Sequence, residues 1–238
     1  MRVLVLSDIH GNLAALEAVP STSYDAVVCL GDLVGYGPNP GPVVRWVREN
    51  ATLTLQGNHD RALADRVAPG CRAQFEWLAQ ATFSLGQQQL SPEELAYLGA
   101  LPRQALRSFD GVRYLFVHAT PSDSLYRYLG PEPDVWAKEV AGVDADVIVV
   151  GHTHIQFELA LAGRRVVNPG SVGQPKDGDP RAAYAVLEDG GVRLCRTAYP
   201  VERTIDAFRN TGVPAEALSA LGSLLRTGRV SANTAAPS

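Results

Sequence analysis

The sequence predicts an α/β fold in which buried strands alternate with helices and end in polar residues. The apolar run 2–6 lacks polar alternation, which is typical of a strand buried on both faces of its sheet. The same construction recurs, because the strands predicted over 24–30 and 52–56 also end in polar residues. The helical segments between these strands have the length expected for right-handed βαβ crossovers.

Composition indicates one soluble globular domain of moderate size. The chain has 238 residues, of which 46% are hydrophobic and 19% charged. We expect the domain to span residues 1–227, with a disordered tail over 228–238. The net charge of -4 argues against a sequence-independent nucleic-acid binder, which needs a basic face. With neither a signal-peptide arrangement nor a membrane-spanning apolar run, we expect a cytoplasmic protein that has no membrane partner.

The N-terminal half is expected to alternate strands and helices. A helix over 12–19 follows the first strand, with Asn12 as its cap and Pro20 at its end. A Gly- and Pro-rich loop follows the second strand and leads to a helix over 41–49. Residues 61–100 are expected to be mainly helical, with a capping box at 91–94. Whether they form a lid or a covering layer is left open.

The C-terminal half is expected to contain three β-hairpins around a buried strand. Turn signals such as Asp110–Gly111 and the sequence 189–191 between apolar runs mark these hairpins. The predicted hairpins cover 103–117, 155–167 and 182–197, the buried strand covers 146–150, the helices cover 132–141, 205–209 and 215–225, and a tight loop covers 168–171.

The five histidines all follow apolar runs, in predicted post-strand loops. Scattered at random, they would also fall in the helices and in the tail, and none does. Four acidic or amide residues occupy equivalent places. The histidines are His10, His59, His118, His152 and His154, and the other four residues are Asp8, Asp32, Asn58 and Asp60. A single such histidine is best interpreted as a hydrogen-bonded loop residue, but five together favour a metal site at the carboxyl ends of the strands.

The mixture of imidazole, carboxylate and amide donors suits a pair of divalent ions. Two ions roughly 3.5–4 Å apart can hold the oxygens of a phosphoryl group. A group that bridges them needs two oxygens, which makes Asp32, alone in its loop, the natural bridge. Neutral imidazoles keep the site positive enough to attract phosphate. The three cysteines are scattered and indicate neither a disulfide framework nor a thiolate metal site.

The ordered set of motifs resembles the calcineurin-like metallophosphoesterase superfamily, and the whole chain resembles its compact bacterial and archaeal phosphoesterases. The matching residues are Asp8 and His10 (DxH), Gly31–Asp32 (GD), Gly57–Asp60 (GNHD), the lone His118 and Gly151–His154 (GHTH). The resemblance implies a four-layer αββα sandwich, with two mixed β-sheets flanked by helices. In the protein phosphatases of this superfamily the GD motif leads into a phosphate-binding arginine, whereas here Leu33 follows, so a protein-phosphatase role is not expected.

The resemblance also implies roles for these residues. One metal would be held by Asp8, His10, Asp32 and His154, and the other by Asp32, Asn58, His118 and His152. A metal-bridging hydroxide would attack phosphorus in line. His59 would protonate the leaving oxygen, and Asp60 would orient His59. An extended segment would also turn the adjacent Asn58 and His59 to opposite sides.

Several alternatives stay open. The first hypothesis is a phosphomonoesterase or phosphodiesterase, the second a non-catalytic scaffold of the same fold that binds a partner protein, and the third a nuclease, which the acidic composition disfavours. The metals are Mn first, with Fe, Ni or Zn as alternatives. We expect a small-molecule phosphoester as substrate, and the sequence leaves open a nucleotide, a cyclic nucleotide, a dinucleoside polyphosphate or a phosphoprotein. A homo-oligomer is compatible with the sequence.

Five further residues have two interpretations each. Arg61, Arg181 and Tyr36 are interpreted as surface or packing residues in preference to substrate contacts. Asn168 and Ser171 either brace the site or form a turn.

Overall fold

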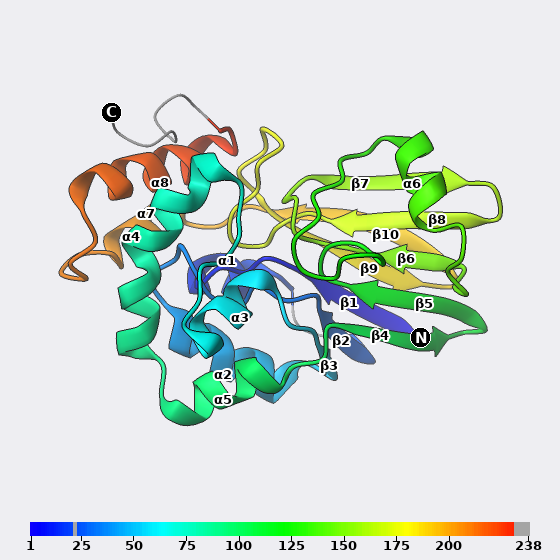
Figure 1. Cartoon of the computed structure of the whole chain (residues 1–238), viewed down its shortest axis with the longest axis horizontal. Coiled ribbons are helices and arrows are strands. Elements are labelled where there is room, and N and C mark those ends of the chain that lie inside the picture. The colour runs from blue at the N-terminus through cyan, green and yellow to red at the C-terminus, as the bar shows by residue number, and fades with distance from the viewer. Residues whose placement is uncertain (21–22, 231–238) are drawn as a thin grey trace.

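Two five-stranded mixed sheets form the centre of the protein in a computed structural model that describes residues 1–20 and 23–230 (Figure 1). The first sheet has the order β10–β9–β1–β2–β3, with β1–β3 parallel and β9 and β10 antiparallel. The second has the order β4–β5–β6–β8–β7, with β5, β6 and β8 parallel. The strands are β1 (Arg2–Leu6), β2 (Ala26–Cys29), β3 (Leu53–Thr54), β4 (Gln104–Phe109), β5 (Val112–Val117), β6 (Val147–Val149), β7 (Gln156–Leu161), β8 (Arg164–Pro169), β9 (Ala182–Glu188) and β10 (Gly191–Thr197).

Helices cover the outer faces of both sheets. In the described residues they are α1 (Leu13–Ala18), α2 (Pro40–Asn50), α3 (Asn58–Asp65), α4 (Ala73–Gln89), α5 (Pro92–Ala100), α6 (Pro133–Glu139), α7 (Val201–Asp206) and α8 (Ala215–Thr227). Figure 1 shows α4, α5 and α8 gathered at one end of the molecule, with α6 alone over the second sheet at the other end.

The pattern of burial confirms the predicted sandwich. In β1, Val3 and Val5 face the second sheet and pack with residues such as Phe116, whereas Leu4 and Leu6 pack with α1 and α2. This is why the run is apolar at every position, as expected for a strand covered on both faces. On the far side of the second sheet, α6 contributes its fully buried Trp136. The layers are therefore helix, sheet, sheet and helix.

A separate helical cluster answers the question that the sequence left open for residues 61–100. Helix α4 packs Phe75 and Leu78 against α8, and this cluster also includes Tyr36 from the loop after β2. Helix α4 is thus part of a covering layer, and its first turn reaches the polar end of the sheets through Tyr36. The capping box that opens α5 is present, since Ser91 Oγ accepts from the Glu94 N–H and Glu94 accepts from the Ser91 N–H.

The structure changes several predicted boundaries. Helix α3 (58–65) begins already at Asn58, so residues 58–60 are helical and not the extended loop expected there, because the Asp60 carboxylate accepts the N–H of Gly57 and so caps the helix. The helix expected at 205–209 is instead α7, which starts after Pro200 and ends at Asp206. Strand β8 runs on through Pro169, into the predicted tight loop. Asn12 caps α1 as predicted, by accepting the Ala15 N–H.

Two further expectations concern the tail and the membrane. Residues 231–238 of the expected tail lie outside the described residues, so the tail stays a prediction. Across residues 1–20 and 23–230, no helix has both the length and the apolar character that crossing a bilayer demands.

Candidate metal centre

The predicted site residues lie at the carboxyl ends of the parallel strands, where the two sheets meet. Backbone hydrogen bonds hold the loops together: Asp8 N donates to Gly31 O, His10 N to Asp32 O, and Gly151 N to His118 O, over distances of 2.8–3.0 Å. The loop after β1 is therefore an extension of its pairing with β2. These bonds set the side chains on one rigid surface before any ligand binds.

Five of the predicted ligands adopt left-handed backbone conformations, although none is a glycine. Their φ angles are 53° for Asp8, 49° for His10, 55° for Asp32, 64° for His152 and 59° for His154. Such conformations cost of order 1 kcal/mol or more each and gather at functional sites. They turn side chains that are two residues apart, such as His152 and His154, toward the same region.

A first cluster joins the DxH loop to the last histidine of the GHTH motif. Asp8, His10 and His154 are all buried, and one donor atom from each lies within 4.8 Å of the others. His154 Nε2 lies 3.2 Å from Asp8 Oδ1 and 3.1 Å from His10 Nε2. The other carboxylate oxygen of Asp8 accepts from Ser7 Oγ and from the His152 N–H, which fixes the carboxylate and leaves Oδ1 facing the two imidazoles.

A second cluster contains Asp32, His118 and His152, with donor atoms again within 4.8 Å of one another. Asn58 joins it, because its Oδ1 lies 3.1 Å from His118 Nε2 while its Nδ2 donates to Pro69 O. His152 donates from Nε2 to Tyr126 O, so its Nδ1 carries the free lone pair.

Asp32 lies between the two clusters. Its Oδ1 accepts the His59 N–H at 2.8 Å. Its Oδ2 lies 3.6 Å from His10 Nε2 in the first cluster and 3.5 Å from His118 Nε2 in the second. The carboxylate therefore occupies the position that a group shared by two metal ions requires.

The orientation of the donors fits metal cations. His10, His118 and His154 each donate from Nδ1 to a backbone carbonyl, of Val34, Leu30 and Gln174 respectively. A neutral imidazole that donates from Nδ1 has only a lone pair at Nε2, so the Nε2 atoms of His10 and His154 turn lone pairs toward each other. Asp8 Oδ1 is likewise buried and has no hydrogen-bond partner in the described residues. Acceptors that converge on acceptors need a cation between them, and a metal-binding histidine usually donates its other ring N–H to a group such as a backbone carbonyl.

The protonation states support the same conclusion. Burial, followed by the neighbouring imidazoles of His154 and His59, holds the pKa of His10 well below its usual value, and burial also lowers the pKa of His118, His152 and His154. These rings are therefore neutral and ready to coordinate at neutral pH. Burial, followed by the carboxylates of Asp8 and Asp60, raises the pKa of Asp32 well above its usual value. Asp32 is thus the carboxylate that gains most from nearby cations.

His59 lies beside the first cluster, on the Tyr36 ring. Its ring centroid is 5.0 Å from that of His10 and 4.7 Å from that of Tyr36. A Cβ added to Gly35 would come within 2.5 Å of His59 Nδ1, which explains the glycine at this position, where φ is also +87°. Because His59 follows Asn58 in a helix, the two side chains diverge through helix geometry, and the extended segment expected from the sequence is wrong.

Asp60 contacts the loop of Asp32 and not the His59 ring. Its carboxylate accepts the backbone N–H groups of Asp32, Leu33 and Gly57 at 2.8–2.9 Å. Any influence of Asp60 on the His59 ring is therefore indirect, through the GD loop and the first turn of α3. In this geometry Asp60 holds the position of the Asp32 backbone.

The structure also places the residues that the sequence left between two interpretations. Ser171 Oγ donates to Asp8 O, and Asn168 Nδ2 donates to Gly151 O, so both residues brace the metal-site loops. Arg181 is exposed and paired with Asp179, and Arg61 contacts Asp65 and the Tyr126 hydroxyl. Tyr36 is buried between α4 and the histidines and has a packing role.

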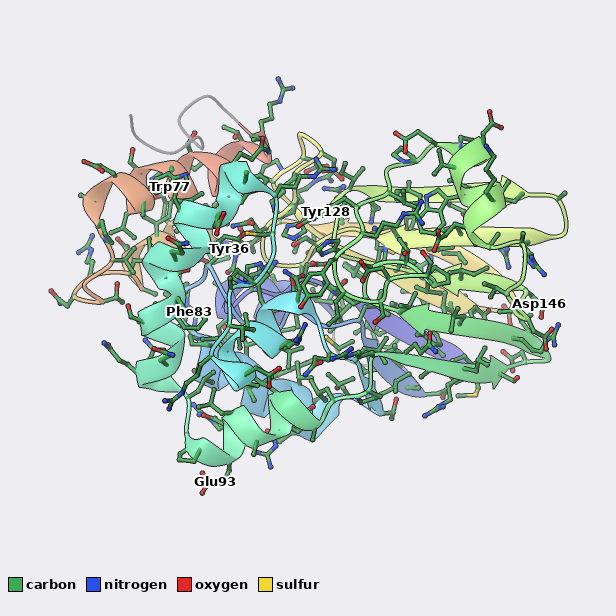
Figure 2. The ribbon with its side chains drawn as sticks, in the orientation of Figure 1. Tyr36, Trp77, Phe83, Glu93, Tyr128 and Asp146 are labelled. Atoms are coloured by element: carbon green, nitrogen blue, oxygen red, sulfur yellow. The ribbon has the colours of Figure 1, made fainter. Side chains whose placement is uncertain are left out.

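Two cations that the sequence did not single out lie over aromatic rings beside the site. The Tyr128 ring lies 3.8 Å from the His152 ring, and Arg72 lies over it. Lys176 lies over Phe75 and Tyr36. Figure 2 shows Tyr36 and Tyr128 near the middle of the molecule, where the helical end meets the sheets. The rarity of lysine was the available signal, since Lys176 is one of only two lysines in the chain.

We expect divalent transition ions to stabilise the fold. At about 100 times its Kd, one bound ion adds about 2.7 kcal/mol to the free energy of unfolding, which raises Tm by about 5–10 °C for a chain of this size. The measurement is thermal unfolding of metal-stripped protein with and without Mn²⁺. Ca²⁺ is the control, because it prefers oxygen to imidazole ligands. Equal unfolding curves with and without Mn²⁺ would contradict this interpretation of the clusters.

A family model and several known proteins are similar to this chain in sequence or structure. A family model described as "Calcineurin-like phosphoesterase superfamily domain" matches residues 1–190. A metallophosphoesterase from Sphaerobacter thermophilus, known from its crystal structure, is 33% identical, with a TM-score of 0.81 over 96% of this chain and 100% of the other. An uncharacterized protein of Methanocaldococcus jannaschii is 29% identical over 89% of this chain and 93% of its own. A symmetrical bis(5'-nucleosyl)-tetraphosphatase of Paracidovorax citrulli is 31% identical over 66% and 67%.

Proposed function

Because the chain belongs to the calcineurin-like phosphoesterase superfamily, we propose that it hydrolyses phosphate esters with the help of two divalent metal ions. The observation that carries the proposal is the position of Asp32 Oδ2, between His10 of one cluster and His118 of the other. When bound there, the ions would polarise the phosphoryl oxygens and activate water. Asp8, His10, Asp32 and His154 would hold one ion, and Asp32, Asn58, His118 and His152 the other.

We propose that the His59 side chain protonates the leaving group. In the overall reaction a water oxygen forms a bond to phosphorus, and the bond from phosphorus to the leaving oxygen breaks. The leaving oxygen takes a proton from His59, and the proton released by water restores the balance. Burial, followed by the charge of Lys176, lowers the pKa of His59 in the free protein. The negative charge of a bound phosphate acts in the opposite direction and favours the protonated imidazole.

Asp60 has a supporting part in this proposal. By accepting three backbone N–H groups, its carboxylate keeps Asp32 at the point between the clusters and holds the first turn of α3 in register. The backbone N–H of His59, in this first turn, donates a hydrogen bond to Asp32 Oδ1. Asp60 therefore acts as a positioning residue for both the bridging carboxylate and the acid.

The proposal is tested with metal-stripped protein reloaded with Mn²⁺, Fe²⁺, Ni²⁺ or Zn²⁺ in turn. The substrates are a nitrophenyl monoester, bis-nitrophenyl phosphate, a cyclic nucleotide and a dinucleoside tetraphosphate, the last suggested by the tetraphosphatase relative. We expect hydrolysis of at least one substrate that depends on added metal and is lost with a chelator. Mn²⁺ is the ion we expect to serve first. Failure with all four ions would overturn the enzymatic proposal and favour the non-catalytic scaffold.

A further inference from the structure

Lys176 is a partly buried cation beside the metal site, and none of the ion pairs within residues 1–20 and 23–230 includes it. Its Nζ lies 4.1 Å from the centroid of the Phe75 ring and 5.6 Å from that of Tyr36. Cation–π contacts of this kind hold a charge in place but do not neutralise it. Among the described residues, no ion pair therefore compensates the positive charge of the ammonium group.

Arg72 is a second cation in the same region. Its guanidinium lies 4.6 Å from the Tyr128 ring centroid, and among the described residues it too has no carboxylate partner. The charge of Arg72 disfavours the charged form of Lys176, and burial, as the larger effect, lowers the pKa of Lys176 to about 8. The carboxylates of Asp8 and Asp32 favour the charged form of Lys176. Among the described residues no ion pair joins either cation to a carboxylate, so both charges can attract an anionic ligand.

Each of these cations lies on an aromatic ring that packs against a metal-site histidine. The Tyr36 ring under Lys176 lies 5.0 Å from the His10 ring, and the Tyr128 ring under Arg72 lies 3.8 Å from the His152 ring. One aromatic ring therefore separates each cation from a metal-site histidine. That histidine is His10 of the first cluster for Lys176 and His152 of the second cluster for Arg72. They stand beside the place where a phosphoryl group would be held and are not among its first contacts.

A purely structural role for Lys176 explains less. Its loop is already held by Arg196, which pairs with Asp177 and donates to Asp179 O, and by the hydrogen bond from Gly178 N to Gly228 O. The backbone N–H of Lys176 itself donates to His154 O, which fixes the residue to the metal site through the main chain. The ammonium group is not needed for either anchor.

We propose that Lys176, with Arg72, binds a second anionic phosphate of the substrate, next to the phosphoryl group at the metal clusters. The chain would then prefer substrates that contain linked phosphates, such as nucleoside or dinucleoside polyphosphates, over esters with a single charged phosphate. This inference deepens the proposed function and rests on it for turnover, whereas the binding of the second phosphate is measured independently of turnover.

The binding test compares inorganic pyrophosphate with orthophosphate on Mn²⁺-loaded protein by calorimetry. We expect Lys176→Met to weaken pyrophosphate about 10- to 100-fold, the loss typical of a hydrogen bond to a charged group, and orthophosphate by less than about 3-fold. Lys138→Met is the matched control, because Lys138 is the other lysine and is exposed on α6. Equal weakening of both anions, or of neither, would overturn the inference.

The activity test compares a nucleoside triphosphate with bis-nitrophenyl phosphate, whose only charge is at the scissile phosphate. Lys176→Met and Arg72→Met should each lower kcat/KM for the triphosphate at least about 10-fold more than for the diester. Arg107→Met, on the exposed strand β4, is the arginine control. A wild-type protein that hydrolyses neither compound, nor any of the other substrates used to test the proposed function, would defeat that function, and pyrophosphate binding would still decide the inference. An active wild type with an unchanged substrate ratio in the variants would defeat the inference alone.

Discussion

Asp32→Asn is expected to remove metal-dependent activity and, at the same time, to make the metal-free protein more stable. The amide keeps one oxygen, which can still accept the His59 N–H as Asp32 Oδ1 does. Its NH₂ group then replaces Oδ2, which lies 3.6 Å from His10 Nε2 and 3.5 Å from His118 Nε2. An amide N–H is a donor and cannot ligate a metal ion, but it can donate to the lone pairs of the two imidazoles.

The direction of the pKa shift of Asp32 determines whether Asp32→Asn raises or lowers the stability of the metal-free protein. Burial, followed by the carboxylates of Asp8 and Asp60, raises the folded-state pKa of Asp32 above its unfolded value. A group of this kind stabilises the fold below its unfolded pKa, and that contribution is lost as pH rises through the folded pKa. Neutral pH lies above the unfolded pKa, so the buried Asp32 carboxyl group destabilises the metal-free fold there, and Asp32→Asn removes this cost.

The measurements are metal content, thermal unfolding and kcat/KM. We expect the bound metal to fall from two ions to at most one, and kcat/KM to fall at least about 10³-fold, or about 4 kcal/mol of transition-state stabilisation. In a chelator at pH 7 the variant should unfold at a higher temperature than wild type, and with Mn²⁺ at a lower one. Asp144→Asn, at an exposed carboxylate, should change none of these. A variant that keeps both ions would show that Asp32 does not bridge them.

The central strands and the gathering of the polar residues could largely be predicted from the sequence, because both depend on local signals. The apolar run 2–6 and the hairpin turn at Asp110–Gly111 predict buried strands and a β-hairpin, and the structure confirms both. Parallel strands then bring their carboxyl ends to one edge, which is why Asp8 and His154, far apart in the chain, meet. The four-layer arrangement came from the resemblance and is confirmed by how β1 divides its side chains between two cores.

The finer arrangement could not be predicted, because it depends on contacts between distant segments. Residues 58–60 follow a strand and look like a loop, and only the capping of Gly57 N by Asp60 makes them the first turn of a helix. The same carboxylate serves the backbone of Asp32, a contact that spacing alone does not reveal. The position of Lys176 could not be predicted either, since nothing near it in the sequence shows that it lies over Tyr36.

His59→Gln is expected to lower turnover by about 10²–10⁴-fold while both metal ions stay bound. The reason is that His59 lies beside the first cluster but is not among the residues whose donor atoms converge there. Glutamine keeps a similar size and can donate a hydrogen bond, but it cannot transfer a proton to the leaving oxygen. The backbone N–H that His59 donates to Asp32 Oδ1 is unaffected by the substitution, so the bridging carboxylate should keep its place.

The chemistry of the leaving group distinguishes a proton donor from a residue that merely supports the site. A nitrophenolate leaves readily without a proton, whereas an alkoxide does not. The loss in kcat for His59→Gln should therefore be at least about 10-fold larger for an alkyl ester than for the nitrophenyl ester of the same phosphate. Elemental analysis confirms the metal content, and Lys138→Met controls for general effects of substitution. Equal losses on both esters would mean that His59 stabilises the phosphoryl group or the fold and is not the acid.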